Sequence, residues 1–384
     1  MTATPLKPRR RVLHVVYRFA IGGLENVVVQ IINGLPRDEF QHMVLALTEV
    51  TDFSKRVEHS DAEFVGLQKK PGHAISLYPR ILEILLSWRP DIVHTCNLAA
   101  LEVMPLAFLA RVPVRVHAEH GWDVTDPHGG SIKHQLIRRF YKYFVTHYIA
   151  VSPDLSGYLT RTVGVPACKV SLVPNGVDTR AFAPVEDPKE DVPGSPFNLR
   201  HYWVVATVGR LEVIKNQIAL ARAFVLLIRL HPEAAGQMRL VIVGEGSQRA
   251  KIETILREGG VAGLAWLPGA RDNVADILRL VDCFVLPSYA EGTSCTLQES
   301  MATALPVVAT AVGGTPALVT EGITGKLVPV DDDAAMAQAL WSYYTDQGRA
   351  KLDGRRGRER IVAEFGLSRM LDKYAQLFNG PIRS

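Results

Sequence analysis

Two glutamates, Glu291 and Glu299, flank a small, hydroxyl-rich segment in the last third of the chain. A buried-strand pattern at residues 283–286 and a Pro-Ser break precede them, which predicts a strand, a loop carrying Glu291 and a helix carrying Glu299 about two turns in. Backbone N–H groups at such a helix N-terminus favour phosphate. A carboxylate farther along the helix can accept hydrogen bonds from vicinal ribose hydroxyls. With a second carboxylate for another polyol, this chemistry describes a sugar nucleotide.

Glutamates at this spacing also occur on helices where both are merely solvated. Glu299, however, lies within Thr-Leu-Gln-Glu-Ser-Met-Ala, one turn from residues that we expect to be buried. A charge in such a place needs a partner. We therefore favour a binding role for the two glutamates.

Two cations straddle an expected turn at the start of a second α/β series. Arg210 and Lys215 follow a strand expected at residues 204–208, in the sequence Gly-Arg-Leu-Glu-Val-Ile-Lys-Asn. A diphosphate leaving group gains negative charge as its glycosidic bond breaks, and cations at this position stabilise it. If the two residues are considered alone, they are ordinary surface cations, and Asn216 caps the helix that follows. Because the glutamate segment is also present, we assign both cations to the diphosphate.

Small-residue turns follow several expected strands. Gly22-Gly23 comes after the first strand, and Gly244 begins a Gly-Glu-Gly turn after a strand at residues 240–243. Such glycines let the backbone approach a ligand closely, or they simply make a tight turn. Leu267 precedes Pro-Gly, where a loop can hold a nucleobase through its backbone groups. Both interpretations stay open for these turns. Gly22-Gly23 is not the Gly-x-Gly-x-x-Gly fingerprint, so a nicotinamide dehydrogenase is not supported.

His120 follows a strand expected at residues 114–118, within Glu-His-Gly-Trp-Asp. At a strand end beside a glycine, its ring can hydrogen-bond a transferred sugar or relay a proton. Ten of the twelve histidines lie in residues 1–178, so most of them must be structural or solvated. Only its position selects His120, and a lone structural histidine is an equally good interpretation.

The segment at residues 132–144 is basic and aromatic with a helical period. Its aromatic side chains can dip into a membrane surface while its cations meet anionic headgroups. In the alternative interpretation, the cations are solvated and the apolar residues face the domain core. The apolar residues concerned are Leu136, Ile137, Phe140 and Phe144. Residues 1–178 carry 20 Lys and Arg against 16 Asp and Glu, so the whole formal net charge of +4 lies in this half and favours an anionic partner there.

The composition predicts a globular protein of two domains. The chain has 384 residues, of which 47% are hydrophobic and 21% charged, too long for one ordinary core and too apolar for a disordered chain. Its four cysteines have no paired spacing, so we expect a reducing compartment and no cysteine-based metal site. No apolar stretch is long enough to span a bilayer, and His14 and Arg18 interrupt the N-terminal apolar run, which favours a first strand over a signal peptide. With no Walker loop, zinc signature or aspartate pair for a divalent metal, we expect a metal-independent protein. We also expect no nucleic acid as a partner.

Short Val, Ile and Leu runs alternate with amphipathic stretches along both halves. Expected strands of the first half are residues 11–17, 42–46, 92–95, 114–118 and 148–151, and expected helices are residues 24–35, 77–87, 98–109 and 132–144. Strands of the second half are expected at residues 204–208, 240–243, 265–267, 283–286, 307–309 and 326–328. The alternation predicts α/β domains with doubly wound parallel sheets. We expect domains at residues 1–178 and 179–363 that face a central cleft, a linker at residues 184–196, and residues 364–384 as a helix packing back on the first domain.

Together these motifs resemble the retaining glycosyltransferases of family 4, which have the GT-B fold of two Rossmann-like domains. The resemblance covers nearly the whole chain and rests on Gly22-Gly23, Gly209-Arg210 with Lys215, residues 291–302 and Asn175-Gly176-Val177-Asp178. It implies metal-independent hexosyl transfer, with retention, from a nucleotide-diphosphate sugar to a glycan or lipid-linked acceptor. UDP-sugar is the expected donor, and no further cofactor is expected. Gly22-Gly23-Leu24-Glu25 and residues 117–123 are most similar to bacterial exosortase (PEP-CTERM)-associated exopolysaccharide transferases.

The resemblance also implies a role for each site residue. Arg210 and Lys215 bind the donor diphosphate, Glu299 binds the ribose, and Glu291 lies near the hydroxyls of the transferred sugar. His120 contacts that sugar, so the expected catalytic residues are His120, Arg210, Lys215 and Glu291. Gly22-Gly23 approaches the diphosphate or the acceptor, and the N–H groups near the phosphates are those of Thr293, Ser294, Cys295 and Thr296. Cys295 departs from the small residues of the family pattern, which leaves the identity of the donor open.

Other classes of protein share this kind of fold. A sugar-nucleotide epimerase releases no glycosylated acceptor, and a phosphorylase needs inorganic phosphate or a lysine-bound pyridoxal cofactor. A non-catalytic sugar-nucleotide-binding protein is a further alternative, against which the complete set of cations and glutamates argues. We expect an enzyme of the cytoplasm, peripheral at the inner face of the membrane, that acts in exopolysaccharide or envelope glycan synthesis.

Overall fold

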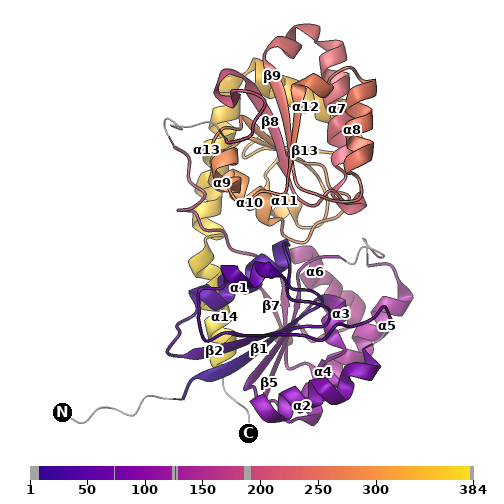
Figure 1. Ribbon diagram of the computed structural model, residues 1–384, viewed down its shortest axis with the longest axis vertical. Helices are drawn as coiled ribbons and strands as arrows, with labels where there is room; N and C mark the ends of the chain where they lie inside the picture. Colours follow the sequence, from indigo (N-terminus) through magenta and orange to yellow (C-terminus); the bar gives the residue numbers. More distant parts are fainter. Residues whose placement is uncertain (1–7, 73, 123–125, 127–128, 186–191, 381–384) are drawn as a thin grey trace, which may run out of the picture. The chain divides into compact units, whose positions relative to one another are not determined.

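The computed structural model describes residues 8–72, 74–122, 126, 129–185 and 192–380. The chain divides into two compact units, residues 1–175 with 368–384 and residues 176–367. In each unit a parallel sheet carries helices on its two faces (Figure 1). Of the expected linker, residues 186–191 lie outside the described residues, as does Asp123 of the segment after the fifth strand. Among the described helices, none combines the length and the apolar character needed to cross a bilayer.

The first unit is built on seven parallel strands in the order β3-β2-β1-β4-β5-β6-β7. Because helices cover both faces, the central strands are apolar on both sides. Leu13 and Val93 pack into the core on one face, and Val16 and Val44 into the core on the other. The strands are β1 (Arg10–Val16), β2 (Phe40–Ala46), β3 (Glu63–Gly66), β4 (Ile92–Cys96), β5 (Val114–Glu119), β6 (His147–Ala150) and β7 (Val170–Leu172). The helices are α1 (Gly23–Gly34), α2 (Tyr78–Trp88), α3 (Asn97–Leu101), α4 (Met104–Leu109), α5 (Ile132–Tyr141), α6 (Pro153–Gly157) and α14 (Leu367–Asn379).

The second unit repeats this construction with six parallel strands in the order β10-β9-β8-β11-β12-β13. Val205 and Leu240 belong to the core on one face, and Val204 and Phe284 to the core on the other. The strands are β8 (Trp203–Val208), β9 (Met238–Val243), β10 (Ala265–Gly269), β11 (Cys283–Leu286), β12 (Val307–Thr310) and β13 (Lys326–Val328). The helices are α7 (Gln217–Leu230), α8 (Arg249–Glu258), α9 (Val274–Leu278), α10 (Cys295–Ala302), α11 (Thr315–Leu318), α12 (Asp333–Thr345) and α13 (Gln347–Glu364).

Both sheets are doubly wound, which confirms the fold class expected from the sequence. In each, the strand order reverses beside the first strand, between β1 and β4 and between β8 and β11. The chain connections leave this point in opposite directions, so the loops after the two strands diverge. Ligands of open α/β sheets bind at the carboxyl ends of the strands at such a switch point.

The sequence reading missed two strands, β3 and β7, for a common reason. Both lie at the edges of the first sheet, and neither contains a fully buried residue. An edge strand contacts a neighbour on one side only and can be short and polar. The long apolar run that identifies a central strand is therefore absent.

Two expected helices differ from the structure. The helix expected at residues 98–109 is divided into α3 and α4, and Pro105 occupies the first turn of α4. Proline fits there because it has no N–H to donate, whereas it disrupts a helix interior. The helix expected at residues 132–144 is α helical only to Tyr141 and ends in a 3-10 turn, Lys142–Phe144.

The C-terminal helix α14 packs on the first sheet. Its buried residues Met370, Tyr374 and Phe378 are spaced by four, which places them on one helical face. The Phe378 ring lies 6.3 Å from those of His14 and Phe40. At the chain end, Arg10 Nη1 donates to the carbonyl oxygen of Phe378 over 2.6 Å. These contacts tie the helix to β1 and β2.

Candidate functional site

Two loops of the second unit lie side by side at its switch point. The loop after β8 carries Arg210 and leads through a short 3-10 turn, Val213–Lys215, into α7. The loop after β11 carries Glu291 and leads into α10. The N–H of Tyr289 donates to the carbonyl oxygen of Ile214 over 2.9 Å, which joins the two loops.

Lys215 and Glu291, 76 positions apart in sequence, form an ion pair in this place. Lys215 Nζ lies 2.7 Å from Glu291 Oε1, and the Ser288 hydroxyl donates to the same oxygen over 2.6 Å. Glu291 is only 6% exposed, so its charge needs partners inside the protein. The two donors compensate this charge and fix the position of the carboxylate. A cation and a carboxylate are thus fixed together at the carboxyl ends of β8 and β11.

The N-terminus of α10 follows directly. Ser294 is the N-cap, and its hydroxyl accepts from the Leu297 N–H over 3.4 Å. Cys295 and Thr296 begin the first turn of the helix. Thr293 and Ser294 are buried, at 7% and 6% exposure. A helix start of this kind is suited to an anion, and the phosphate role of these residues stays a prediction.

Glu299 lies in the second turn of α10 and is half-buried. Its neighbours Gln298 and Ser300 are fully buried, which agrees with the premise that its charge lies beside the core. Arg210, in contrast, is exposed, and its carbonyl oxygen accepts from Gln217 Nε2 over 3.1 Å. The carbonyl oxygen of Arg210 is thus held by a hydrogen bond, and the residue is open to solvent.

Gly244 has a packing reason to be glycine. Its φ is +141°, and a Cβ at this position would lie 1.9 Å from the carbonyl oxygen of Gly209. The loops after β8 and β9 therefore touch backbone to backbone, and the structural interpretation of this turn holds. Leu267 lies within β10, and its carbonyl oxygen accepts from Arg249 Nη2 over 2.8 Å. A nucleobase role for either residue stays a prediction.

In the first unit, Gly22, Gly23 and His120 come from loops after β1 and β5. Gly22 caps α1 in an extended conformation, and α1 begins at Gly23. His120 directly follows β5, and its N–H donates to the Asn97 side-chain oxygen over 2.7 Å. Asn97 itself follows β4 with a φ of +59°. The end of β4 thus positions the start of the His120 loop.

His120 is 9% exposed. Burial lowers its pKa to about 4, although the nearby side chain of Asn175 and the charge of Glu119 act in the opposite direction. The imidazole is therefore neutral at neutral pH. A neutral ring can both donate and accept a hydrogen bond, as contact with a sugar hydroxyl requires.

The basic aromatic helix α5 is oriented differently from its core-facing interpretation. Leu136 and Phe140 are exposed, at 56% and 59%, and are not core residues, whereas Phe144, after the helix, packs against the core as that interpretation expected. Arg138 is the buried residue of this helix, and it binds Glu119 through Nε at 2.6 Å and Nη2 at 3.2 Å. Burial by itself raises the pKa of Glu119, but Arg138, followed by His117, outweighs it and holds that pKa well below its usual range.

Reading the sequence missed three residues that position the site. They are Ser288, which donates to Glu291; Gly313, whose Cβ would lie 1.9 Å from the Glu291 carbonyl oxygen; and Asn97. Each follows an expected strand, so a search of every strand end for polar residues and glycine would have found them. The predicted residues divide between the two units. His120, Gly22 and Gly23 lie in the first, and the remainder lie in the second.

Two family models match the chain. The model described as "Glycosyltransferase Family 4" matches residues 21–181, and that described as "Glycosyl transferases group 1" matches residues 203–346. An Escherichia coli protein named UDP-Gal:alpha-D-GlcNAc-diphosphoundecaprenol alpha-1,3-galactosyltransferase is 28% identical over 386 residues, which cover 96% of each chain.

Solved structures show the same fold. HepE of Anabaena, crystallised with UDP and glucose, has a TM-score of 0.82 at 19% identity and covers 97% of this chain and 100% of its own. The lipopolysaccharide outer core galactosyltransferase WaaB has a TM-score of 0.67 at 17% identity, over 96% of this chain and 98% of its own. These likenesses confirm the expected GT-B fold.

Proposed function

The chain belongs to the family 4 glycosyltransferases, and from this premise we propose that it transfers a hexose, with retention, from a UDP-sugar to a lipid-linked glycan acceptor. The observation that carries the donor assignment is the Lys215–Glu291–Ser288 cluster beside the start of α10, at the switch point of the second sheet. HepE was crystallised with UDP and glucose, and the E. coli relative is named for transfer of galactose to a diphosphoundecaprenol-linked sugar. Both support a UDP-hexose and a lipid-linked acceptor.

Each side chain has a chemical role in this proposal. Arg210 and Lys215 stabilise the charge that develops on UDP as it leaves, while the N–H groups from Thr293 to Thr296 contact the phosphates. Glu299 accepts from the ribose hydroxyls. Glu291, already held by two donors, accepts from hydroxyls of the transferred hexose. Because protein cations and helix N–H groups supply the positive field, the reaction proceeds without a divalent metal and retains activity in a chelator.

The direct test is transfer itself. The protein is incubated with a panel of UDP-sugars and a diphosphoundecaprenol-linked sugar acceptor, and the products are identified by mass spectrometry and NMR. A glycosylated acceptor with an α linkage from an α-linked donor supports the proposal. An epimerised nucleotide sugar, or turnover that requires inorganic phosphate, identifies the epimerase or phosphorylase alternative. Tight UDP binding without any product identifies a binding protein.

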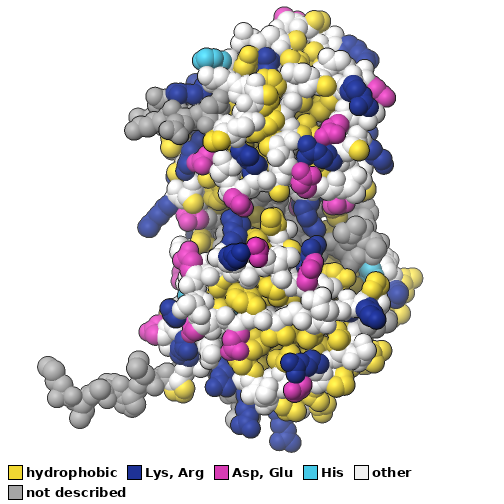
Figure 2. All heavy atoms as spheres, in the orientation of Figure 1, with side chains coloured by type: hydrophobic (Ala, Val, Ile, Leu, Met, Phe, Trp, Pro, Cys, Tyr) yellow, Lys and Arg dark blue, Asp and Glu magenta, His cyan; other side chains and the backbone are white. Residues whose placement is uncertain are grey.

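The lipid-linked acceptor leads to a second proposal, that the first unit binds an anionic membrane surface through α4 and α5. Apolar side chains with 53–76% exposure form what we call the α4–α5 surface: Phe108, Leu109, Ile132, Leu136, Phe140 and Tyr143. Ile132, Leu136 and Phe140 are spaced by four along α5 and form one stripe. The exposed cations Lys133 and Arg139 lie on α5, and the exposed Arg111 follows α4. Apolar and basic side chains appear together in this region (Figure 2). Such a surface fits lipid tails and anionic headgroups.

Liposome flotation tests this surface. Leu136→Glu with Phe140→Glu removes two apolar contacts, each worth about 1.5–3 kcal/mol if buried in lipid, so binding to vesicles containing phosphatidylglycerol should fall at least about tenfold. Leu230→Glu is the matched control, because Leu230 is 61% exposed in the second unit and should leave flotation unchanged. Equal flotation of all three proteins rules the surface out. A cytoplasmic enzyme acting at the inner membrane face in envelope or exopolysaccharide synthesis fits this arrangement.

A further inference from the structure

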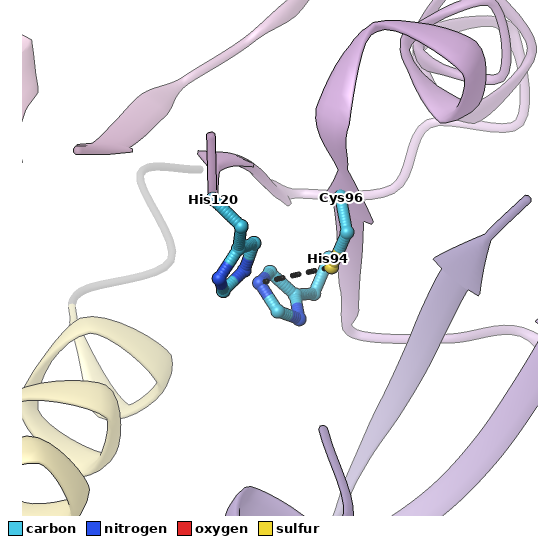
Figure 3. Close-up of side chains that lie close together, drawn as sticks. All are labelled: His94, Cys96 and His120. Atoms are coloured by element: carbon cyan, nitrogen blue, oxygen red, sulfur yellow. Dashed lines mark hydrogen bonds between the residues drawn. The ribbon is translucent and has the colours of Figure 1, made fainter. Parts of the chain in front are cut away.

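A cluster of His94, Cys96 and His120 lies buried in the first unit. His94 and Cys96 are two residues apart on β4 and therefore project from the same face, and His120 follows the neighbouring strand β5. One ligand atom from each residue lies within 4.8 Å of the other two. Figure 3 shows the His120 ring close to that of His94, which lies beside the Cys96 sulfur. His94, Cys96 and His120 are 0%, 2% and 9% exposed, so the cluster opens toward His120.

The spacing of the ligand atoms fits a transition metal. Cys96 Sγ lies 3.8 Å from His94 Nε2. Zinc bonds of about 2.3 Å to sulfur and about 2.0 Å to nitrogen, at a tetrahedral angle, place two such atoms roughly 3.6 Å apart. Small side-chain rotations would therefore complete the geometry. A thiolate with two imidazoles is a borderline-soft ligand set that favours zinc over magnesium or calcium.

A chain of hydrogen bonds positions His94. Its Nδ1 lies 3.0 Å from Nδ1 of His14, and His14 Nε2 lies 3.0 Å from Nδ1 of His42. These contacts leave Nε2 of His94 directed toward Cys96. Metal-bound histidines donate their second N–H to an acceptor in this manner, which fixes the ring and its tautomer. His94 then donates from Nδ1 to His14, and His14 donates from Nε2 to His42.

An unsatisfied hydroxyl borders the same cluster. The hydroxyl of Tyr374 on α14 is buried and has no hydrogen-bond partner among the described residues. The Tyr374 ring lies 5.6 Å from that of His94. A phenol hydroxyl at this place can donate a hydrogen bond to the cluster.

We propose that His94, Cys96 and His120 bind Zn²⁺ through a thiolate and two neutral imidazoles, with the fourth position open to water. On binding, the Cys96 Sγ–H proton passes to solvent and a sulfur–zinc bond forms. A ring nitrogen of His120 then coordinates the ion, so the ring is no longer available to contact the sugar. Zinc therefore inhibits sugar transfer, a consequence that rests on the proposed function, whereas binding of the metal does not.

Cobalt serves as the spectroscopic probe of binding. The full chain carries Cys168→Ser to remove its exposed thiol, and Co²⁺ is titrated under reducing conditions. A thiolate-to-cobalt charge-transfer band that Zn²⁺ displaces is the expected result. Cys96→Ser should lose the band and weaken Zn²⁺ binding at least about 100-fold. The matched control is Cys283→Ser, which replaces a buried thiol in the second unit and should keep the band.

His14→Asn provides a second variant that leaves the three ligands intact. Loss of the outer hydrogen bond should weaken Zn²⁺ binding about 10–100-fold. If no charge-transfer band forms in the folded protein, or if Cys96→Ser and His14→Asn both bind Zn²⁺ as tightly as the parent, the proposal is overturned and the cluster is a hydrogen-bonded core.

The activity measurement separates this inference from the proposed function. The ratio of turnover with and without Zn²⁺ is compared within each protein. A large decrease in the parent and none in Cys96→Ser supports inhibition through this site. Zinc bound at the cluster without loss of transfer keeps the metal site but overturns the assignment of His120 to the sugar.

Discussion

Replacing Lys215 by methionine separates its two roles, the ion pair with Glu291 and the contact with the donor diphosphate. Methionine keeps most of the apolar stem and removes the charge. Lys215 Nζ lies 2.7 Å from Glu291 Oε1, and the two side chains are 26% and 6% exposed. In Lys215→Met the Glu291 carboxylate stays almost buried, with the Ser288 hydroxyl at 2.6 Å as its donor.

The cost to stability follows from this geometry. Two charges 2.7 Å apart attract by about 6 kcal/mol at an effective dielectric constant of about 20, and their desolvation offsets most of that. Breaking a fully buried pair costs about 3–5 kcal/mol. Because a quarter of the Lys215 side chain is exposed, we expect about 2 kcal/mol. In a unit of this size that lowers the melting temperature by about 4–8 °C.

Binding of UDP is expected to respond differently. UDP contains the diphosphate but no hexose, so Lys215→Met removes a charge-assisted contact worth about 1.5–3 kcal/mol, a loss of roughly 10–100-fold in affinity. Glu291→Gln should bind UDP as well as the parent, because Glu291 is assigned to the hexose. In the double variant, melting temperature should return toward that of the parent while UDP affinity stays as low as in Lys215→Met.

Differential scanning calorimetry gives the melting temperatures, and isothermal titration calorimetry gives the UDP affinities. Lys215→Arg is the matched control, since it keeps the charge. Its melting temperature and its UDP affinity should both fall less than those of Lys215→Met. The reasoning is refuted if UDP affinity recovers together with melting temperature in the double variant. Lys215 would then act only by holding Glu291 in place.

Three further predictions concern other parts of the chain. Glu299→Ala should weaken UDP binding by about 1.5–3 kcal/mol, seen by titration calorimetry, and unchanged affinity would remove the ribose assignment. Burial lowers the pKa values of His14, His42, His94 and His120 below 6.5. Between pH 6.5 and about 4 the unfolded state therefore binds more protons, and stability should fall with pH by up to about 1.4 kcal/mol per histidine and pH unit. Thermal melts in a chelator measure this, and a flat profile from pH 7 to 5 contradicts it. Arg138→Met should cost about 3–5 kcal/mol because Glu119, 1% exposed, loses its cation; denaturant unfolding would show recovery when Glu119→Gln is added.

The parts of the fold that the sequence predicted are those whose signal is local. Central strands such as β8 and β11 are buried on both faces and appear as largely apolar runs, and the loop residues after them could be assigned to the carboxyl end of a sheet. Lys215 and Glu291 were both predicted in this way. Their ion pair was not, because 76 positions separate them and only the adjacency of β8 and β11 brings them together.

The cluster of His94, Cys96 and His120 could not be predicted either, because it too depends on which strands are neighbours. Cysteine spacing gave no indication of a metal site, since the third ligand, His120, lies 24 positions after Cys96 and follows another strand, β5. Parallel register places His14 directly beside His94, and α14, from the far end of the chain, covers both with Phe378. A pattern of single residues in a sequence carries no information about such neighbours until the strand order is known.

Helix α5 has an apolar stripe that faces outward and an arginine that faces inward. A helix that only packs on its own sheet gains stability by turning its apolar residues inward, yet α5 exposes Leu136 and Phe140 and buries Arg138. Each apolar side chain that stays exposed loses about 1.5–3 kcal/mol of stabilisation that burial would give. The attraction between Arg138 and Glu119 must also offset the cost of desolvating both charges. The buried arginine helps to anchor the helix through its ion pair with Glu119 and leaves the apolar stripe outward. That arrangement is understandable if the stripe is covered in the cell, and an anionic bilayer matches both its apolar centre and its flanking cations.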